Sequence, residues 1–197
     1  MLQDAFLPLD RCPHCNVAQP NMLKRAAQDT KALDGSNWRQ WVMYSCRTCG
    51  GCVLTAAPFA GGKNYPIAAI WPQPSQVDEA VPQRARQFLQ QAIASLQAPA
   101  GATMLAASSV DAMLKEKGLV EGTLYKRIEE AQNQHLITPE MAAWAHEVRL
   151  DANDQRHADE EAEMPNEADA RRSIEFVQAL AQFLFVLPSR VARGRKK

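Results

Sequence analysis

Cys12-Pro13-His14-Cys15 and Cys46-Arg47-Thr48-Cys49 are the two stretches that decide the fold of the N-terminal part of this chain. Each stretch places two thiols two residues apart, and thirty residues separate the pairs. A Cys-x2-Cys turn directs two thiolates toward one point, and four thiolates complete the tetrahedral shell that zinc accepts. The spacing therefore predicts a structural zinc site whose ligands are Cys12, Cys15, Cys46 and Cys49.

Strand-like segments flank the second cysteine pair. Residues 41–44 lead into Cys46 and residues 53–55 lead away from the pair, which is typical of the hairpin of a zinc ribbon. The segment between the pairs contains residues 23–33, whose composition favours a helix. We therefore expect residues 1–60 to form a zinc ribbon with a helical insert.

Two neighbouring side chains leave alternatives open at the metal site. Cys52 repeats the Cys-x2-Cys spacing after Cys49, so it could replace Cys49, although a free thiol is the favoured interpretation. His14 lies inside the first turn and could in principle bind zinc, but four thiolates are better placed and a surface histidine is favoured. A redox role for Cys12 and Cys15 is less favoured because no βαβ pattern surrounds them.

Length and composition exclude several classes of protein. The chain has 197 residues, 46% of them hydrophobic, with 22 Lys and Arg against 22 Asp and Glu. The apolar content argues against a disordered chain, and the zero net charge argues against a histone-like coat. The acidic N-terminus does not resemble a secretory signal, and no local apolar run predicts a membrane span. We expect a cytoplasmic protein that does not contact a membrane.

The remainder of the chain divides into a linker, a helical segment and a tail. Prolines and glycines punctuate residues 61–82, which contain one short predicted strand at 67–71. Helical periodicity then predicts a bundle of four to five helices over residues 83–188, with a basic tail at 189–197. The fold class is thus α+β, with a small β ribbon before an all-α bundle.

Local signals predict where these helices begin and end. Pro99 with Gly101 should end the first helix, and Pro188 should end the last. Helix starts are predicted at Thr123, at Thr138 and at Asn166, since each residue type caps a helix N-terminus.

A dense set of polar residues lies on the predicted fourth helix. Arg149, Asn153 and His157 are spaced at i, i+4 and i+8, which places them along one helical face. A fixed cation, an amide and an imidazole in line could bind a phosphate and move a proton. The plainer alternative pairs Arg149 with an acid and leaves Asn153 and His157 at the C-terminal turn. The acids after this helix, Asp159, Glu160, Glu161 and Glu163, indicate a solvated loop or, together with His157, a metal-dependent hydrolase.

Residues 81–187 resemble the domain-of-unknown-function family 4145, which is similar in turn to the HEPN superfamily of helical bundles. The resemblance rests on five short segments, at residues 98–107, 117–119, 136–141, 148–157 and 185–188. It implies a bundle that dimerises, with the Arg/Asn/His motif near the dimer seam and a zinc-binding segment ahead of it. Ala152 precedes Asn153 here, where the usual nuclease motif has arginine.

In active HEPN relatives this motif supports metal-independent RNA cleavage. By that resemblance His157 would be the general acid or base, Arg149 or Arg156 would stabilise charge on the phosphate, and Asn153 would orient one of them. Two hypotheses arise for the whole chain. The first is a protein acting on or with RNA or DNA, in defence or restriction, for which cleavage of RNA is one option. The second is a non-catalytic dimeric adaptor that binds a protein or nucleic-acid partner, with the ribbon contacting the partner.

Overall fold

The computed structural model describes residues 1–59, 65–73, 77–157 and 163–195, without the side chains of residues 156 and 157. It divides into two compact units, Met1–Ser75 and Gln76–Lys197. The first unit is built on strands and the second on helices, so the predicted α+β class is confirmed.

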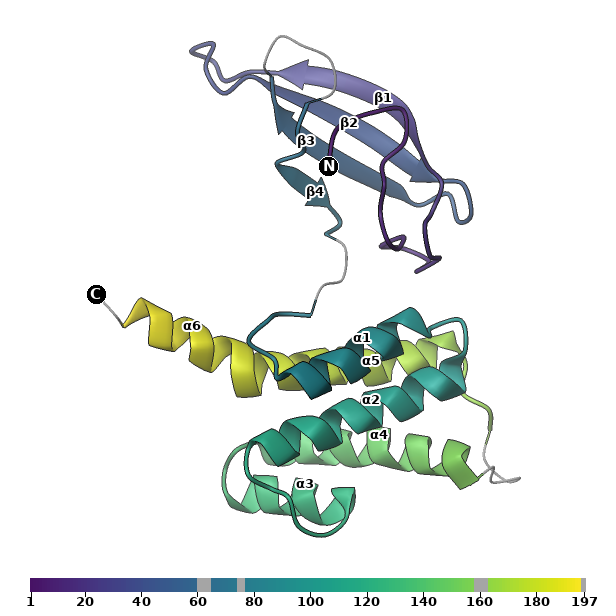
Figure 1. Ribbon diagram of the computed structural model, residues 1–197, viewed down its shortest axis with the longest axis vertical. Coiled ribbons are helices and arrows are strands. Elements are labelled where there is room, and N and C mark those ends of the chain that lie inside the picture. The colour runs from purple at the N-terminus through teal and green to yellow at the C-terminus, as the bar shows by residue number, and fades with distance from the viewer. Residues whose placement is uncertain (60–64, 74–76, 158–162, 196–197) are drawn as a thin grey trace. The chain divides into compact units, whose positions relative to one another are not determined.

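The N-terminal unit is a four-stranded antiparallel sheet whose strands follow one another in chain order (Figure 1). The strands are β1 (Met22–Thr30), β2 (Arg39–Cys46), β3 (Cys52–Pro58) and β4 (Ala69–Trp71). β2 and β3 are the strands predicted on either side of the second cysteine pair. β4 is the short strand predicted within the linker.

One face of the sheet is covered by the first residues of the chain. Val42, Tyr44 and Val53 are fully buried on this face, and Leu7 and Leu9 pack against the same cluster. The segment is held by the Leu7 backbone N–H, which donates to the Met22 carbonyl at 3.0 Å. The carboxamide of Gln3 also donates to the Thr55 side chain at 3.0 Å. Residues 1–9 therefore complete the hydrophobic core of this unit.

The predicted helix over residues 23–33 is wrong, because this segment forms most of β1. Its residues are good helix formers, but β2 offers backbone partners from Met22 opposite Cys46 to Thr30 opposite Arg39, with one irregularity between Lys24 and Ala26. Only Met22 of β1 is fully buried, so no alternation of apolar and polar residues marks the strand. Pairing with a neighbouring strand outweighs the small intrinsic preference for a helix.

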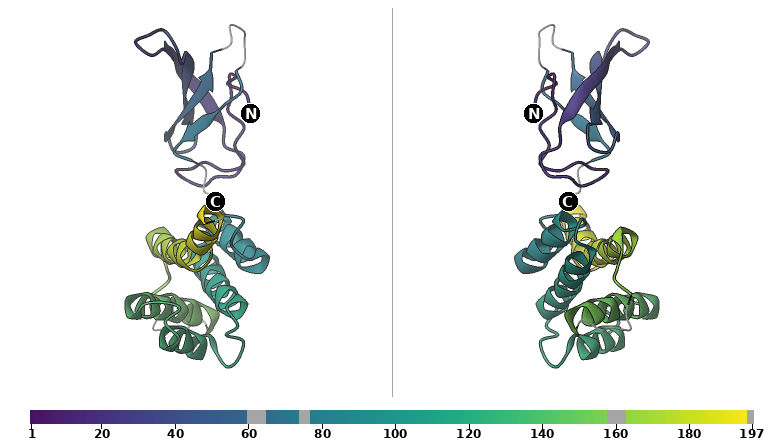
Figure 2. Two further views of the ribbon diagram at one scale, coloured as in Figure 1. Left: turned by 90° about the vertical axis from the view of Figure 1, so that its left-hand side faces the viewer. Right: turned by 90° about the vertical axis from the view of Figure 1, so that its right-hand side faces the viewer.

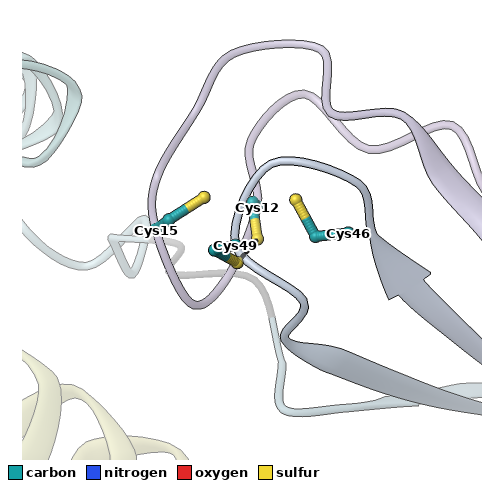
Figure 3. Close-up of side chains that lie close together, drawn as sticks. All are labelled: Cys12, Cys15, Cys46 and Cys49. Carbon is teal, nitrogen blue, oxygen red and sulfur yellow. Dashed lines mark hydrogen bonds between the residues drawn. The ribbon is translucent and has the colours of Figure 1, made fainter.

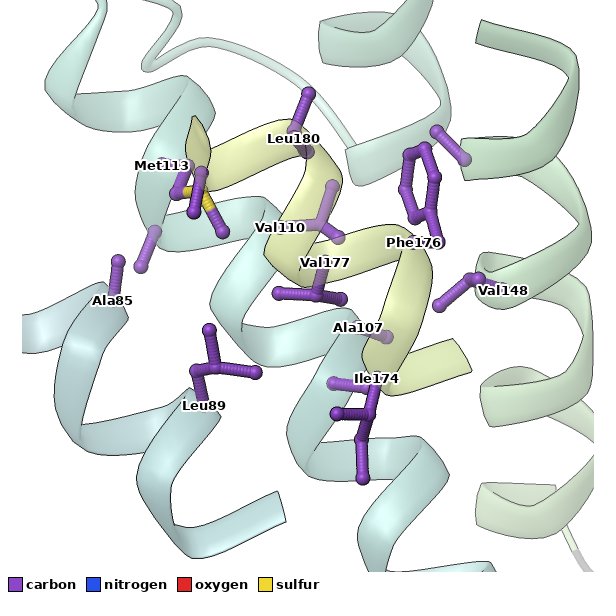
Figure 4. Close-up of a cluster of buried hydrophobic side chains, with 14 of the residues drawn as sticks. Ala85, Leu89, Ala107, Val110, Met113, Val148, Ile174, Phe176, Val177 and Leu180 are labelled. Atoms are coloured by element: carbon purple, nitrogen blue, oxygen red, sulfur yellow. The ribbon is translucent and has the colours of Figure 1, made fainter. Parts of the chain in front are cut away.

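Within the described residues the C-terminal unit is a bundle of five helices, the last of which is extended by two further helical segments. The five are α1 (Gln83–Ala94), α2 (Pro99–Glu116), α3 (Leu124–Asn133), α4 (Pro139–His157) and α5 (Glu167–Ala181). Helix α2 is central and packs against the other four (Figures 1 and 2). Figure 4 shows the core, in which Leu89 of α1, Val110 of α2, Val148 of α4 and Val177 of α5 converge.

The predicted starts of three helices are confirmed by their caps. The Thr123 side chain accepts from the backbone N–H of Lys126, and the Thr138 hydroxyl accepts from that of Met141 at 3.2 Å. Asn166 and Asp169 form a reciprocal capping box at the start of α5. These side chains satisfy backbone donors that the first turn of a helix leaves unpaired.

Two predicted helix ends are wrong. Pro99 occupies the first turn of α2 and does not end α1, in keeping with the preference of proline for that position. Pro188 lies inside a helix that continues from α5 through a π-helical turn, η1 (Gln182–Val186), into α6 (Leu187–Gly194). Proline has no backbone N–H to donate, and its ring crowds a carbonyl of the preceding turn. The wider π-helical turn makes room for the ring, so the helix continues past Pro188. Residues 189–194 of the predicted tail are therefore helical.

The continuous helix Glu167–Gly194 is long and apolar enough, by length and composition, to cross a membrane. The expectation that the chain has no such run rested on Gln178 and Gln182, which interrupt the apolar residues 176–187. In the bundle, Phe176, Val177 and Leu180 of this helix are buried against its neighbours. Core packing therefore accounts for the apolar composition of α5.

We predict that Phe176→Ala destabilises the helical unit by about 3–5 kcal/mol. Phe176 is fully buried, and the centre of its ring lies 5.0 Å from that of the Trp144 ring. Truncation to alanine therefore leaves a cavity between α4 and α5. Urea unfolding monitored by circular dichroism measures the loss. Gln178→Ala, at an exposed position of the same helix, is the control and should change stability by less than about 0.5 kcal/mol.

Candidate functional site

Four cysteine side chains meet at one end of the sheet (Figure 3). Cys12 and Cys15 come from the N-terminal loop, Cys46 ends β2, and Cys49 lies in the turn before β3. Their Sγ atoms all lie within 4.8 Å of one another, and those of Cys12 and Cys49 are 3.9 Å apart. Four sulfurs about 2.3 Å from a zinc ion would lie about 3.8 Å apart. The separations fit a metal shell and are too long for a disulfide.

Backbone groups and burial set the acidity of these thiols. The backbone N–H groups of His14 and Gly51 donate to the sulfurs of Cys12 and Cys49, each at 3.4 Å. Burial raises the pKa of Cys12 and raises that of Cys15 to about 12. Burial opposes ionisation of Cys46 as well, but hydrogen bonds from its own turn outweigh burial and lower its pKa to about 7. A divalent cation would stabilise all four thiolates.

The two alternative ligands lie outside this cluster. Cys52 is exposed, and its sulfur contacts the carbonyl of Gly50 at 3.8 Å. The Nε2 atom of His14 lies 2.7 Å from the carbonyl oxygen of Cys52. Within the described residues, the four cysteines are the one group of cysteine, histidine and acidic side chains close enough to share a metal ion.

A second feature is a pocket of about 640 Å³ in the helical unit. Its walls come from four helices and the turn before α3, and they carry both charged and aromatic side chains. The cations among them are Arg84, Lys115, Arg127 and Arg149, and the acids are Asp111 and Glu116. Cations outnumber carboxylates by four to two, so the pocket favours an anionic ligand.

Arg149 and Asn153 both line this pocket, which agrees with their predicted position on one face of α4. The side chains of Arg156 and His157 lie outside the described residues, as do three of the acids after this helix. Arg149 makes no ion pair with any described residue, and its pairing with an acid in the plainer alternative stays a prediction for the residues outside this set. Its Nε atom is buried and has no hydrogen-bond partner in the described part of the chain, and its guanidinium lies 5.4 Å from the centre of the Tyr125 ring.

Arg127 has a structural role at the floor of the pocket. It is 8% exposed and makes two contacts to Asp111, one of 2.8 Å and one of 2.7 Å. It also donates to the carbonyls of Val120, Glu121 and Gly122, which closes the turn before α3. Lys115 lies 2.6 Å from the same aspartate. Because Asp111 is shared by two cations, it does not balance the charge of Arg149.

Two side chains that line the pocket, Arg84 and Tyr125, were not predicted from the sequence. Arg84 of α1 lies 5.8 Å from the centre of the Phe88 ring and forms part of the wall. Tyr125 lines the pocket, and its ring is tilted by 35° against that of His146, with 4.8 Å between ring centres. His146 in turn lies 3.1 Å from Glu129. Basic and aromatic residues on three separate helices carry no local motif, so only the packing of the bundle could reveal them.

Comparison with known families gives a match over residues 89–197, more than half of the chain, to the domain of unknown function DUF4145. The chain belongs to the DUF4145 family. Neither the curated proteins nor the solved structures contain a match. The DUF4145 domain contains Arg149, Asn153 and Tyr125, whereas Arg84 and all five cysteines precede it. The cysteine cluster is thus an addition ahead of the DUF4145 domain.

We predict that chelation or loss of one cysteine ligand unfolds the sheet and leaves the DUF4145 domain folded. Cys46→Ser should lower the zinc content from one ion per chain to none, because a hydroxyl is a poor replacement for a thiolate. Native mass spectrometry measures the metal, and helical circular dichroism should persist. Cys52→Ser is the matched control and should keep its zinc. Equal zinc content in both variants would contradict the assignment of the ligands.

Proposed function

We propose that this protein binds nucleic acid and that Arg149 holds a backbone phosphate in the pocket of the helical unit. The observation that carries the proposal is the buried Nε of Arg149, which has no partner among the described residues. A guanidinium presents forked donors that match phosphate oxygens, and an unpaired buried donor is costly. A phosphate in the pocket would satisfy it.

The surroundings of Arg149 support a nucleic-acid strand over a small anion. Tyr125 is 48% exposed and lies beside the guanidinium, so a nucleobase could stack on it while the adjoining phosphate contacts Arg149. Arg84 adds a second cation to the wall. Ser108 and Asn153 supply neutral hydrogen-bonding groups beside these charges.

The cysteine cluster has a structural role in this proposal. A zinc ion held by Cys12, Cys15, Cys46 and Cys49 would fix the N-terminal loop against the end of the sheet and form a zinc ribbon. Its full shell of thiolates would leave no position for substrate or water. Catalysis would therefore not involve this metal.

The finer proposal is metal-independent cleavage of RNA, which rests on the resemblance to the HEPN superfamily. The ribose 2′-oxygen attacks the neighbouring phosphorus and the bond to the 5′-oxygen breaks, leaving a 2′,3′-cyclic phosphate. A base accepts the 2′-hydroxyl proton, and an acid donates a proton to the departing 5′-oxygen. His157 is assigned one of these transfers, and Arg149 stabilises the charge on the phosphate. Asn153, which lies one turn before His157, orients the His157 side chain.

The biological setting rests on the same resemblance. We place the protein in the cytoplasm, away from membranes, as a homodimer formed through the helical unit, with a role in defence or restriction. The competing candidate is a non-catalytic adaptor whose zinc ribbon binds a protein partner. The two candidates differ in whether RNA is cut.

We predict that Arg149→Gln weakens binding of a fluorescein-labelled single-stranded RNA by about tenfold or more, because a charge-assisted contact to phosphate is lost. Fluorescence anisotropy of the full-length protein measures the affinity. The matched control is Arg172→Gln, which removes an exposed arginine that pairs with Asp169 on α5. Equal affinities for the two variants would refute the pocket as a phosphate site.

For catalysis we expect full-length protein to cut RNA in EDTA, with cyclic phosphate ends, and His157→Ala to abolish the cut while retaining RNA binding. Gel analysis of labelled RNA gives the rate and mass spectrometry identifies the ends. Cleavage that survives the substitution would reject His157 as the catalytic residue. Binding without any cleavage by the unaltered protein would favour the adaptor. Cleavage that is lost in EDTA and restored by Mg²⁺ or Mn²⁺ without zinc would favour a metal-dependent hydrolase, since EDTA also removes a structural zinc.

A further inference from the structure

The open face of the N-terminal sheet carries a cluster of large apolar side chains, namely Trp41, Met43, Leu54 and Trp71, which we call the aromatic platform. Met43 is paired with Leu54, and Leu54 with Trp71, so these three form a row across β2, β3 and β4. Paired residues of antiparallel strands point to the same face. The platform is therefore the face opposite to that covered by residues 1–9.

The platform combines exposure with fixed geometry. Met43, Leu54 and Trp71 are 37%, 39% and 44% exposed, whereas Val42 and Tyr44, the neighbours of Met43 on β2, are fully buried. The rings of Trp41 and Trp71 stack at 5.6 Å between centres and 30° between planes. The Trp41 indole N–H donates to the Thr30 hydroxyl at 2.8 Å, which holds that ring in place. A ligand would meet aromatic surface that is already ordered.

Charge on the same face is positive. The Nε of Arg25 donates to the Ser45 hydroxyl at 2.6 Å, and Ser45 lies on the same face as Trp41 and Met43. Arg39 occupies the other end of that row of β2. The four strands contain one carboxylate, Asp29, which is paired with Gln40 and so points to the opposite face. The platform thus has arginines toward both ends and no strand carboxylate.

We propose that the aromatic platform binds single-stranded nucleic acid, with bases stacked on Trp71 and Trp41 and phosphates contacting Arg25 and Arg39. Stacked aromatic rings flanked by cations match a ligand that alternates flat bases with negative charges. A duplex hides the faces of its bases and would contact only the arginines. A protein surface would match the apolar row but would gain nothing specific from cations toward both ends. The site lies outside the DUF4145 domain and does not depend on the pocket around Arg149.

The test uses the full-length protein with labelled single strands of oligouridine and oligothymidine and a duplex of equal length. Trp71→Ala should weaken binding of the single strands by roughly 5- to 100-fold, and Trp71→Phe should restore most of it, because phenylalanine still stacks. Arg39→Gln should weaken binding and reduce its salt dependence. Zinc content and circular dichroism verify that each variant is folded.

Trp38→Ala is the matched control, since Trp38 is also exposed but stacks on Phe59, outside the platform. Unchanged affinity of Trp71→Ala, or equal losses for Trp38→Ala and Trp71→Ala, would overturn the proposal. So would a duplex that competes as well as the single strand. The two proposed sites can be distinguished. If Trp71→Ala weakens binding of the single strands and Arg149→Gln does not, the platform is supported and the pocket is not. If Arg149→Gln weakens binding and Trp71→Ala does not, the platform proposal is overturned.

Discussion

Four sulfur atoms confined within 4.8 Å of one another form the constraint on which the N-terminal unit depends. The buried cluster on the covered face of the sheet has only eight residues in the described chain, and two of these are Cys12 and Cys46. So small a core gives limited stability, and a metal ion held by the four sulfurs would crosslink the N-terminal loop to the hairpin and add what burial cannot supply. The helical unit contains no cysteine and relies on a larger core around α2.

Features that depend on neighbours in sequence were predictable, and those that depend on distant partners were not. The cysteine pairs and the caps at Thr123, Thr138 and Asn166 each act within a few residues, and the structure has them as predicted. β1 escaped prediction because its partner strand, not its own residues, decides its conformation. The walls of the pocket escaped for the same reason, since Arg84 and Tyr125 approach Arg149 only through helix packing.

Some cations of the pocket are paired with groups of the protein itself, whereas Arg149 can pair with a ligand. Asp111 is paired with both Lys115 and Arg127, and Arg127 is further held by three carbonyls of the turn before α3. Arg149 lines the same pocket and has no carboxylate partner among the described residues. Its guanidinium lies over the Tyr125 ring. Fixed partners stabilise the scaffold, and a cation without a partner retains its electrostatic free energy for a ligand.

The π turn at residues 182–186 sets the two parts of the last helix out of phase. In an unbroken α-helix Val191 would come two turns after Leu184 and continue the inward row of Val177 and Leu180. One added residue in the turn rotates the rest of the helix by about 100°. Leu184 is buried, whereas no described residue of α6 is, and Val191 is exposed. A helical wheel drawn straight through this segment would therefore assign the wrong surface to the C-terminal end of the chain.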